Sequence, residues 1–187
     1  MIRHLLGATL AIALILFIAL PPASSRTWRT TPDQLARDYL TINDTRPGGE
    51  MVLLMWLASP MLQPGINGRE NLAAILDRYV LIMAVHGHFD RVSGTASFDD
   101  ITALQATDKN GAPLNALTQD KIPPTAAGIV TVMEGVFRQV VGPMGKGMKT
   151  FIFDSGSVGV CKSGVLSVPY AGETYTWKTP IPGCQQI

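Results

Sequence analysis

A central β-strand is predicted at residues 79–89, which read YVLIMAVHGHF. β-Branched and aromatic side chains are frequent in this segment, and no polar face recurs at the 3.6-residue period of a helix. An apolar run of this kind is typical of a strand that is covered on both faces. We therefore expect residues 79–89 to lie in the middle of a sheet, with the other elements arranged around them.

Shorter, half-buried strands are expected after this segment, at residues 93–98 and 101–107. An Asn110-Gly111 step follows, and such a step accepts positive φ and closes hairpins. Residues 113–125 are expected to be loop. Four more short strands separated by glycine-containing turns are predicted near the C-terminus, at residues 149–153, 157–161, 165–169 and 173–178.

Helices are predicted on both sides of the first group of strands. A capping box at Thr31 opens one helix, and Asn67 caps another short one. Between them, residues 51–62 are apolar almost all round and are expected to form a buried helix. The clearest helical pattern is residues 125–141, where one apolar stripe ends at Gly142.

These elements predict an α+β fold. N-terminal helices would pack on an antiparallel β-sheet or small sandwich, with one inserted helix and a C-terminal disulfide. The layout of short strands around residues 108–111 resembles that of bacterial immunoglobulin-like sandwich modules. This resemblance is one of architecture and implies no activity.

Residues 1–25 have the composition of an export signal. A basic start precedes an apolar stretch at residues 5–20, and residues 21–25 supply prolines and small residues suited to signal-peptidase cleavage. Cleavage after Ser25 would leave residues 26–187 as one periplasmic or secreted domain. The alternative is an uncleaved inner-membrane anchor, since the apolar stretch is only slightly shorter than the ~17 to 25 residues of a membrane-spanning helix.

The numbers of acidic and basic residues indicate which kinds of partner the protein can bind. The chain contains 15 Lys and Arg against 14 Asp and Glu, for a formal net charge of +1. Nucleic-acid binding requires clustered Lys and Arg, and these residues are scattered here. We therefore exclude nucleic acid as a partner. Contact with a membrane is expected only if the signal remains as an anchor.

Cys161 and Cys184 are the two cysteines of the chain. In an exported protein, a disulfide is the expected state of such a pair. It would close a loop of about 24 residues and stabilise the fold by roughly 3 kcal/mol on the chain-entropy model.

The histidines of the predicted central strand form the first candidate site. His86 and His88 are two residues apart, so their side chains leave the same face of a strand, and Asp90 continues that face. Two imidazoles and a carboxylate can hold zinc or copper, and a further ligand would come from Asp99 or Asp100. The competing interpretation is that these are polar residues where a buried strand leaves the sheet, with no cofactor.

A second candidate site is suggested by residues 154–156. The sequence Asp-Ser-Gly at this point resembles the nucleophile segment of chymotrypsin-like serine proteases. The resemblance implies a hydrolase in which His86, Asp99 and Ser155 are catalytic. Phe153 departs from that family, which places a glycine there, and a β-turn between two strands accounts for the same three residues.

Tyr175 and Trp177 alternate on the last predicted strand, so they can line one face and stack on a ligand or partner. The alternative is that both simply pack against the sheet. No complete set of nucleophile, base and orienting group is evident in the chain. The sequence therefore favours a non-catalytic exported module that binds an envelope protein or a small ligand, with metal binding and hydrolysis as the alternatives.

Overall fold

The computed structural model describes residues 38–44, 46–62, 67–90, 92–140 and 142–184. The expected signal segment and the capping box at Thr31 lie outside these residues. The described part of the chain combines α-helices with antiparallel strands. None of its helices is both long and apolar enough to cross a bilayer.

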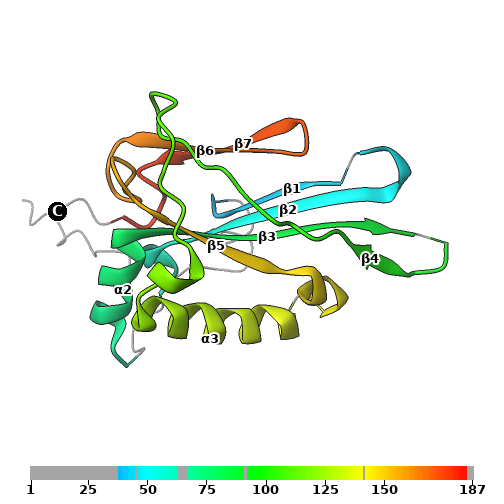
Figure 1. Ribbon diagram of the computed structural model, residues 1–187, viewed down its shortest axis with the longest axis horizontal. Helices are drawn as coiled ribbons and strands as arrows, with labels where there is room; N and C mark the ends of the chain where they lie inside the picture. The colour runs from blue at the N-terminus through cyan, green and yellow to red at the C-terminus, as the bar shows by residue number, and fades with distance from the viewer. Residues whose placement is uncertain (1–37, 45, 63–66, 91, 141, 185–187) are drawn as a thin grey trace, which may run out of the picture.

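A five-stranded antiparallel sheet forms the centre of the fold (Figure 1). Strand β3 pairs with β2 along one edge, and along the other it pairs first with β5 and then, near its end, with β4. Strand β1 extends the sheet beyond β2. The strand bounds are β1 Leu40–Asn43, β2 Glu50–Leu57, β3 Tyr79–Phe89, β4 Ala96–Phe98 and β5 Lys149–Asp154. The predicted central strand is confirmed as β3.

This sheet lies between two layers. Helices α2 (Arg69–Arg78) and α3 (Pro124–Val140) cover one face, and the hairpin of β6 (Gly164–Tyr170) and β7 (Glu173–Thr179) lies over the other (Figure 1). Because both faces are covered, most of β2 and β3 is buried. The helical layer distinguishes the fold from an immunoglobulin-like sandwich, in which two sheets form both layers.

The contact between the sheet and the β6–β7 hairpin is built on two tryptophans. Trp56 of β2 and Trp177 of β7 meet edge to face, with ring centroids 6.3 Å apart and an interplanar angle of 74°. The indole Nε1 of Trp177 donates a hydrogen bond of 3.0 Å to the carbonyl oxygen of Tyr39. The hairpin is thus attached to both β2 and the residue that precedes β1.

The prediction of a buried helix at residues 51–62 was wrong. Most of this segment belongs to strand β2, and a 3₁₀ turn, η2 (Ser59–Met61), follows it. A strand that is buried on both faces loses the alternation of polar and apolar residues that normally identifies it. Leu and Met, which favour helices, then dominated the sequence pattern.

Most of the other predicted elements are confirmed. The short helix after Asn67 and the inserted helix correspond to α2 and α3, and three of the four C-terminal strands correspond to β5, β6 and β7. The predicted cap of α2 was wrong, because its N-cap is Gly68, in the left-handed conformation, and not Asn67. Strand β4 begins only at Ala96, because the residues before it form the turn that follows β3.

Two predicted strands, at residues 101–107 and 157–161, are absent from the described structure. Thr107 forms only isolated bridges, to Pro113 and Ser167. The predicted turn at residues 108–111 is present, and the carboxylate of Asp108 accepts bonds from the backbone of Asn110 and Ala112 and from the Ser157 hydroxyl. These bonds, that from Ser157 above all, lower the pKa of Asp108. Residues 157–161 form successive turns instead of pairing with a strand.

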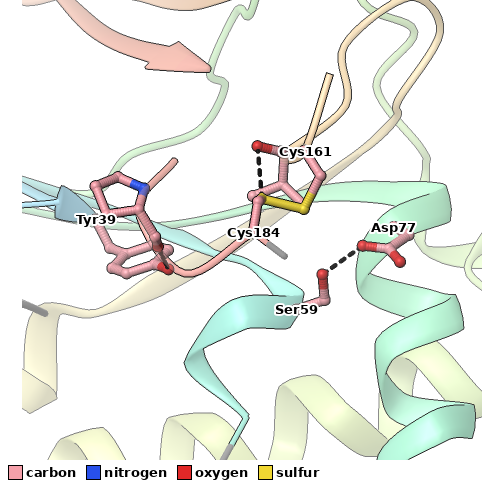
Figure 2. The surroundings of a disulfide bond; sticks show 7 residues. Tyr39, Ser59, Asp77, Cys161 and Cys184 are labelled. Carbon is pink, nitrogen blue, oxygen red and sulfur yellow. Dashed lines mark hydrogen bonds between the residues drawn. A yellow bond between two sulfur atoms is a disulfide. The ribbon is translucent and has the colours of Figure 1, made fainter. Parts of the chain in front are cut away.

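The predicted disulfide between Cys161 and Cys184 is present, with Cα atoms 5.3 Å apart (Figure 2). Its surroundings include the hydrogen bond from the Ser59 hydroxyl to the Asp77 carboxylate, which joins η2 to α2. The Tyr39 hydroxyl also donates to the carbonyl of Pro182, close to Cys184. The disulfide therefore secures the C-terminal segment at the α2 end of the sheet, opposite to β4 (Figure 1).

Candidate functional site

Polar side chains gather at the β4 end of the sheet, under the tip of the β6–β7 hairpin. We call this set the histidine cluster; its members are Arg46, Glu50, His86, His88, Asp99 and Tyr170. The strand register brings them together, because Glu50 of β2 lies opposite His88 of β3 and Val52 lies opposite His86. Residues that alternate along paired strands share a face, so both histidines and Glu50 project toward the hairpin.

His86 is held through both of its ring nitrogens. Its Nε2 lies 2.9 Å from Glu50 Oε1, and its Nδ1 lies 3.0 Å from the Tyr170 hydroxyl. A carboxylate can only accept, so Nε2 donates to Glu50, whereas the Tyr170 hydroxyl can either donate to Nδ1 or accept from it. The side chain is only 15% exposed. These contacts fix the orientation of the imidazole.

Arg46 connects the start of β2 to the tip of the hairpin. Its Nη1 donates to Glu50 Oε1 at 2.5 Å, and its Nη2 donates to the carbonyl oxygen of Ala171. Ala171 and Gly172 both have positive φ and form the tight turn between β6 and β7. The guanidinium therefore compensates the charge of Glu50 and ties the hairpin to the sheet.

His88 and Asp99 form the accessible side of the histidine cluster. Asp99 Oδ2 lies 3.5 Å from the Nε2 atom of His86 and 3.5 Å from that of His88. The backbone of Asp99 is fixed, because its N–H donates to the carbonyl of His86 at 2.9 Å. The side chains of His88 and Asp99 are 49% and 48% exposed. They can therefore rotate and contact a ligand from solvent.

Asp90 and Asp100, the other carboxylates expected near the histidines, are engaged elsewhere. Asp90 accepts from the backbone of Val92 and Ser93 and from the Ser93 hydroxyl, and these bonds lower its pKa. It thereby closes the turn after β3. Asp100 accepts from the ammonium group of Lys149. The carboxylates that the structure brings to the histidines are Glu50 and Asp99.

A cleft of about 950 Å³ adjoins the histidine cluster, and Arg46 and His88 belong to both. Phe89 and Ser97 also line it. At Gly49, a Cβ atom would lie 2.4 Å from the carbonyl oxygen of Phe89. Glycine at this position therefore lets the segment before β2 approach the end of β3 in the wall of the cleft.

The structure does not bring Ser155 to His86. The backbone N–H of Ser155 donates to the carbonyl of Arg78, which directly precedes β3. His86 is eight residues further along that strand, which is about 26 Å at the ordinary rise of a strand. Of the three residues in the hydrolase hypothesis, only His86 and Asp99 are close together.

Tyr175 and Trp177 point into the interior. Their exposed fractions are 4% and 5%, and they lie on the inner face of the hairpin, where Leu166 and Val168 of β6 are their cross-strand partners. Burial raises the pKa of Tyr175. Their position corresponds to packing against the sheet.

Comparison with protein-family models, with curated proteins and with solved structures found no match to this chain. The candidate site is therefore assigned from its geometry. Glu50, Arg46 and Tyr170 were not identified from the sequence, because they come from β2, from the residues before it and from β6. The signal that would have found Glu50 is the pairing of residues 50–57 with residues 81–88.

Proposed function

We propose that this protein is a non-catalytic exported module that binds a small polar ligand in the cleft beside the histidine cluster, with a segment of an envelope protein as the alternative occupant. The observation that carries the proposal is that Arg46 and His88 belong to the histidine cluster and also line the cleft. A recess lined by charged, hydroxyl and aromatic groups offers both hydrogen bonds and apolar contact.

The contacts of His86 argue for binding rather than catalysis. Its nitrogens are occupied by Glu50 and Tyr170, and Ser155 lies at the other end of β3. Tyr170 is itself a poor nucleophile here, because burial and the nearby charge of Asp99 raise the pKa of its phenol. Among the residues that the structure describes, an activated nucleophile beside a base, as covalent catalysis requires, is thus not assembled around this histidine.

The disulfide supports export. Bonds such as that between Cys161 and Cys184 persist in oxidising compartments and are rare in the cytosol. Together with the signal-like residues 1–25, it favours a periplasmic or secreted location.

Site-specific photo-cross-linking in the native host tests the binding proposal. A photoreactive amino acid replaces Ser97, which is exposed in the cleft, and in a control chain it replaces Val132, which is 65% exposed on α3. Since α3 covers the other face of the sheet, we expect a defined adduct from position 97 and none from position 132. Equal labelling at both positions, or no adduct at position 97, would contradict the proposal.

A further inference from the structure

We infer that the histidine cluster binds one Zn²⁺ ion through His86, His88, Asp99 and Glu50. The inference rests on the proposed function only in treating this end of the molecule as a ligand-binding site. Imidazole nitrogens and carboxylate oxygens are common zinc ligands. The ligand set differs from the one that the sequence suggests, because Glu50 and Asp99 take the place of Asp90.

Three distances between candidate ligand atoms are close to those that a single ion requires. Zinc bonds to nitrogen and oxygen are about 2.0 to 2.2 Å long, so two ligands of a tetrahedral zinc lie roughly 3.3 to 3.6 Å apart. Asp99 Oδ2 lies 3.5 Å from the Nε2 atoms of both histidines. Glu50 Oε1 lies 2.9 Å from His86 Nε2, and this contact would lengthen slightly as the ion replaces the shared proton.

The residues behind the ligands support the same assignment. A histidine that binds a metal through Nε2 donates from Nδ1 to a neighbouring acceptor, which fixes its ring. The Tyr170 hydroxyl lies 3.0 Å from His86 Nδ1 and can accept that bond as well as donate it. Arg46 Nη1 donates to Oε1 of Glu50 and so orients that carboxylate. Two of the four ligands are thus oriented before an ion arrives.

The remaining two ligands must move a short way. No group of three or more His, Cys, Asp or Glu side chains in the described residues has the geometry of a formed metal site. Because His88 and Asp99 are each about half exposed, they can rotate onto an ion without disturbing the core. His88 also lines the cleft, which gives an ion a path from solvent.

The charges of the cluster favour a cation. Glu50 and Asp99 bring two negative charges, and Arg46 brings one positive charge. With neutral imidazoles the cluster carries a net negative charge, which a divalent ion would offset.

Isothermal titration calorimetry with Zn²⁺ on the untagged, purified chain tests the inference. The informative variants are H88A and D99N, because these exposed side chains contribute little to folding. The matched control is D100N, which changes a neighbouring carboxylate that is engaged with Lys149. Thermal unfolding of each variant without zinc shows that its fold is retained.

We expect the parent protein and D100N to bind about one Zn²⁺ per chain, and H88A and D99N to bind it at least about tenfold more weakly. No saturable binding by the parent protein, or equal affinity in H88A and D99N, would overturn the inference. The titration uses purified protein and the cross-linking uses the native envelope. Zinc binding can therefore fail while the position-97 adduct still forms, and the reverse outcome is equally distinguishable.

Discussion

Gly48 and Gly49, just before β2, have the same left-handed backbone conformation, but only Gly49 lies in close contact with another part of the chain. Comparing substitutions at the two positions therefore separates the free-energy cost of the conformation from that of the contact. Gly48 and Gly49 have nearly equal φ values, +75° and +74°. A Cβ atom at position 48 would meet nothing within 4 Å, whereas one at position 49 would lie 2.4 Å from the Phe89 carbonyl oxygen. The second substitution therefore requires a shift of the backbone in the wall of the cleft.

We accordingly predict that Gly48→Ala lowers the free energy of unfolding by about 1 to 2 kcal/mol, the ordinary cost of a left-handed conformation. Gly49→Ala should cost about 2 to 4 kcal/mol, because overpacking is added to the same strain. Denaturant unfolding of both variants beside the parent protein measures the difference. Equal losses would show that the approach to Phe89 is not a constraint.

At the residue scale, the sequence located part of the candidate site. His86 and His88 were identified because residues two apart on a strand share a face, which depends on local geometry alone. Glu50 and Tyr170 are separated from His86 by 36 and 84 positions in the chain. Their approach depends on strand register and on how the hairpin lies over the sheet, and neither is encoded in a local pattern.

At the element scale, β2 and β3 show that the alternation of polar and apolar residues does not identify a strand that is buried on both faces. Both strands are buried between the helices and the hairpin, so neither alternates. Residues 79–89 were still identified as a strand, because Val80, Ile82 and Val85 are β-branched. Residues 50–57 contain Val52 as their single β-branched residue, and because residues 51–62 are apolar almost all round they were expected to form a buried helix.

The attachment of the β6–β7 hairpin to the sheet through Arg46 can be tested by substitution. Arg46→Met keeps most of the apolar stem but removes the donors to Glu50 and to the Ala171 carbonyl. We expect amide hydrogen exchange at the hairpin tip to accelerate by about tenfold or more, since a charged hydrogen bond contributes about 1.5 to 3 kcal/mol. Exchange in the paired part of β3 and β5 should change much less.

Lys178→Met is the matched control for this measurement. It makes the same replacement of a cation by Met on an exposed position of β7, opposite Val165. Exchange at the tip should remain at the parent rate in this variant. If both variants behave alike, or if Arg46→Met leaves the tip protected, Arg46 does not hold the hairpin on the sheet.

At the scale of the whole molecule, the sheet separates a cross-linked end from a polar end. Strand β3 begins near α2, on the side of the disulfide, and ends at the cleft beside β4 (Figure 1). The sequence predicted the disulfide, because two cysteines in a chain that is expected to be exported leave one pairing. It predicted helices packed on an antiparallel sheet, but not that α2 and α3 share one face while the β6–β7 hairpin covers the other.

This separation leads to a prediction about the disulfide. Cys161→Ser and Cys184→Ser should each lower the free energy of unfolding by about 3 kcal/mol, and the double variant by the same amount, because each abolishes one loop closure. Thiol labelling of the protein isolated from its native host without reductant should detect no free cysteine. Since the histidine cluster lies at the other end of β3, the double variant should keep the parent affinity for Zn²⁺ at temperatures where it remains folded. Two reactive thiols, or unequal losses in the single variants, would contradict the role of the disulfide, and a loss of zinc affinity would show that the two ends of the sheet are coupled.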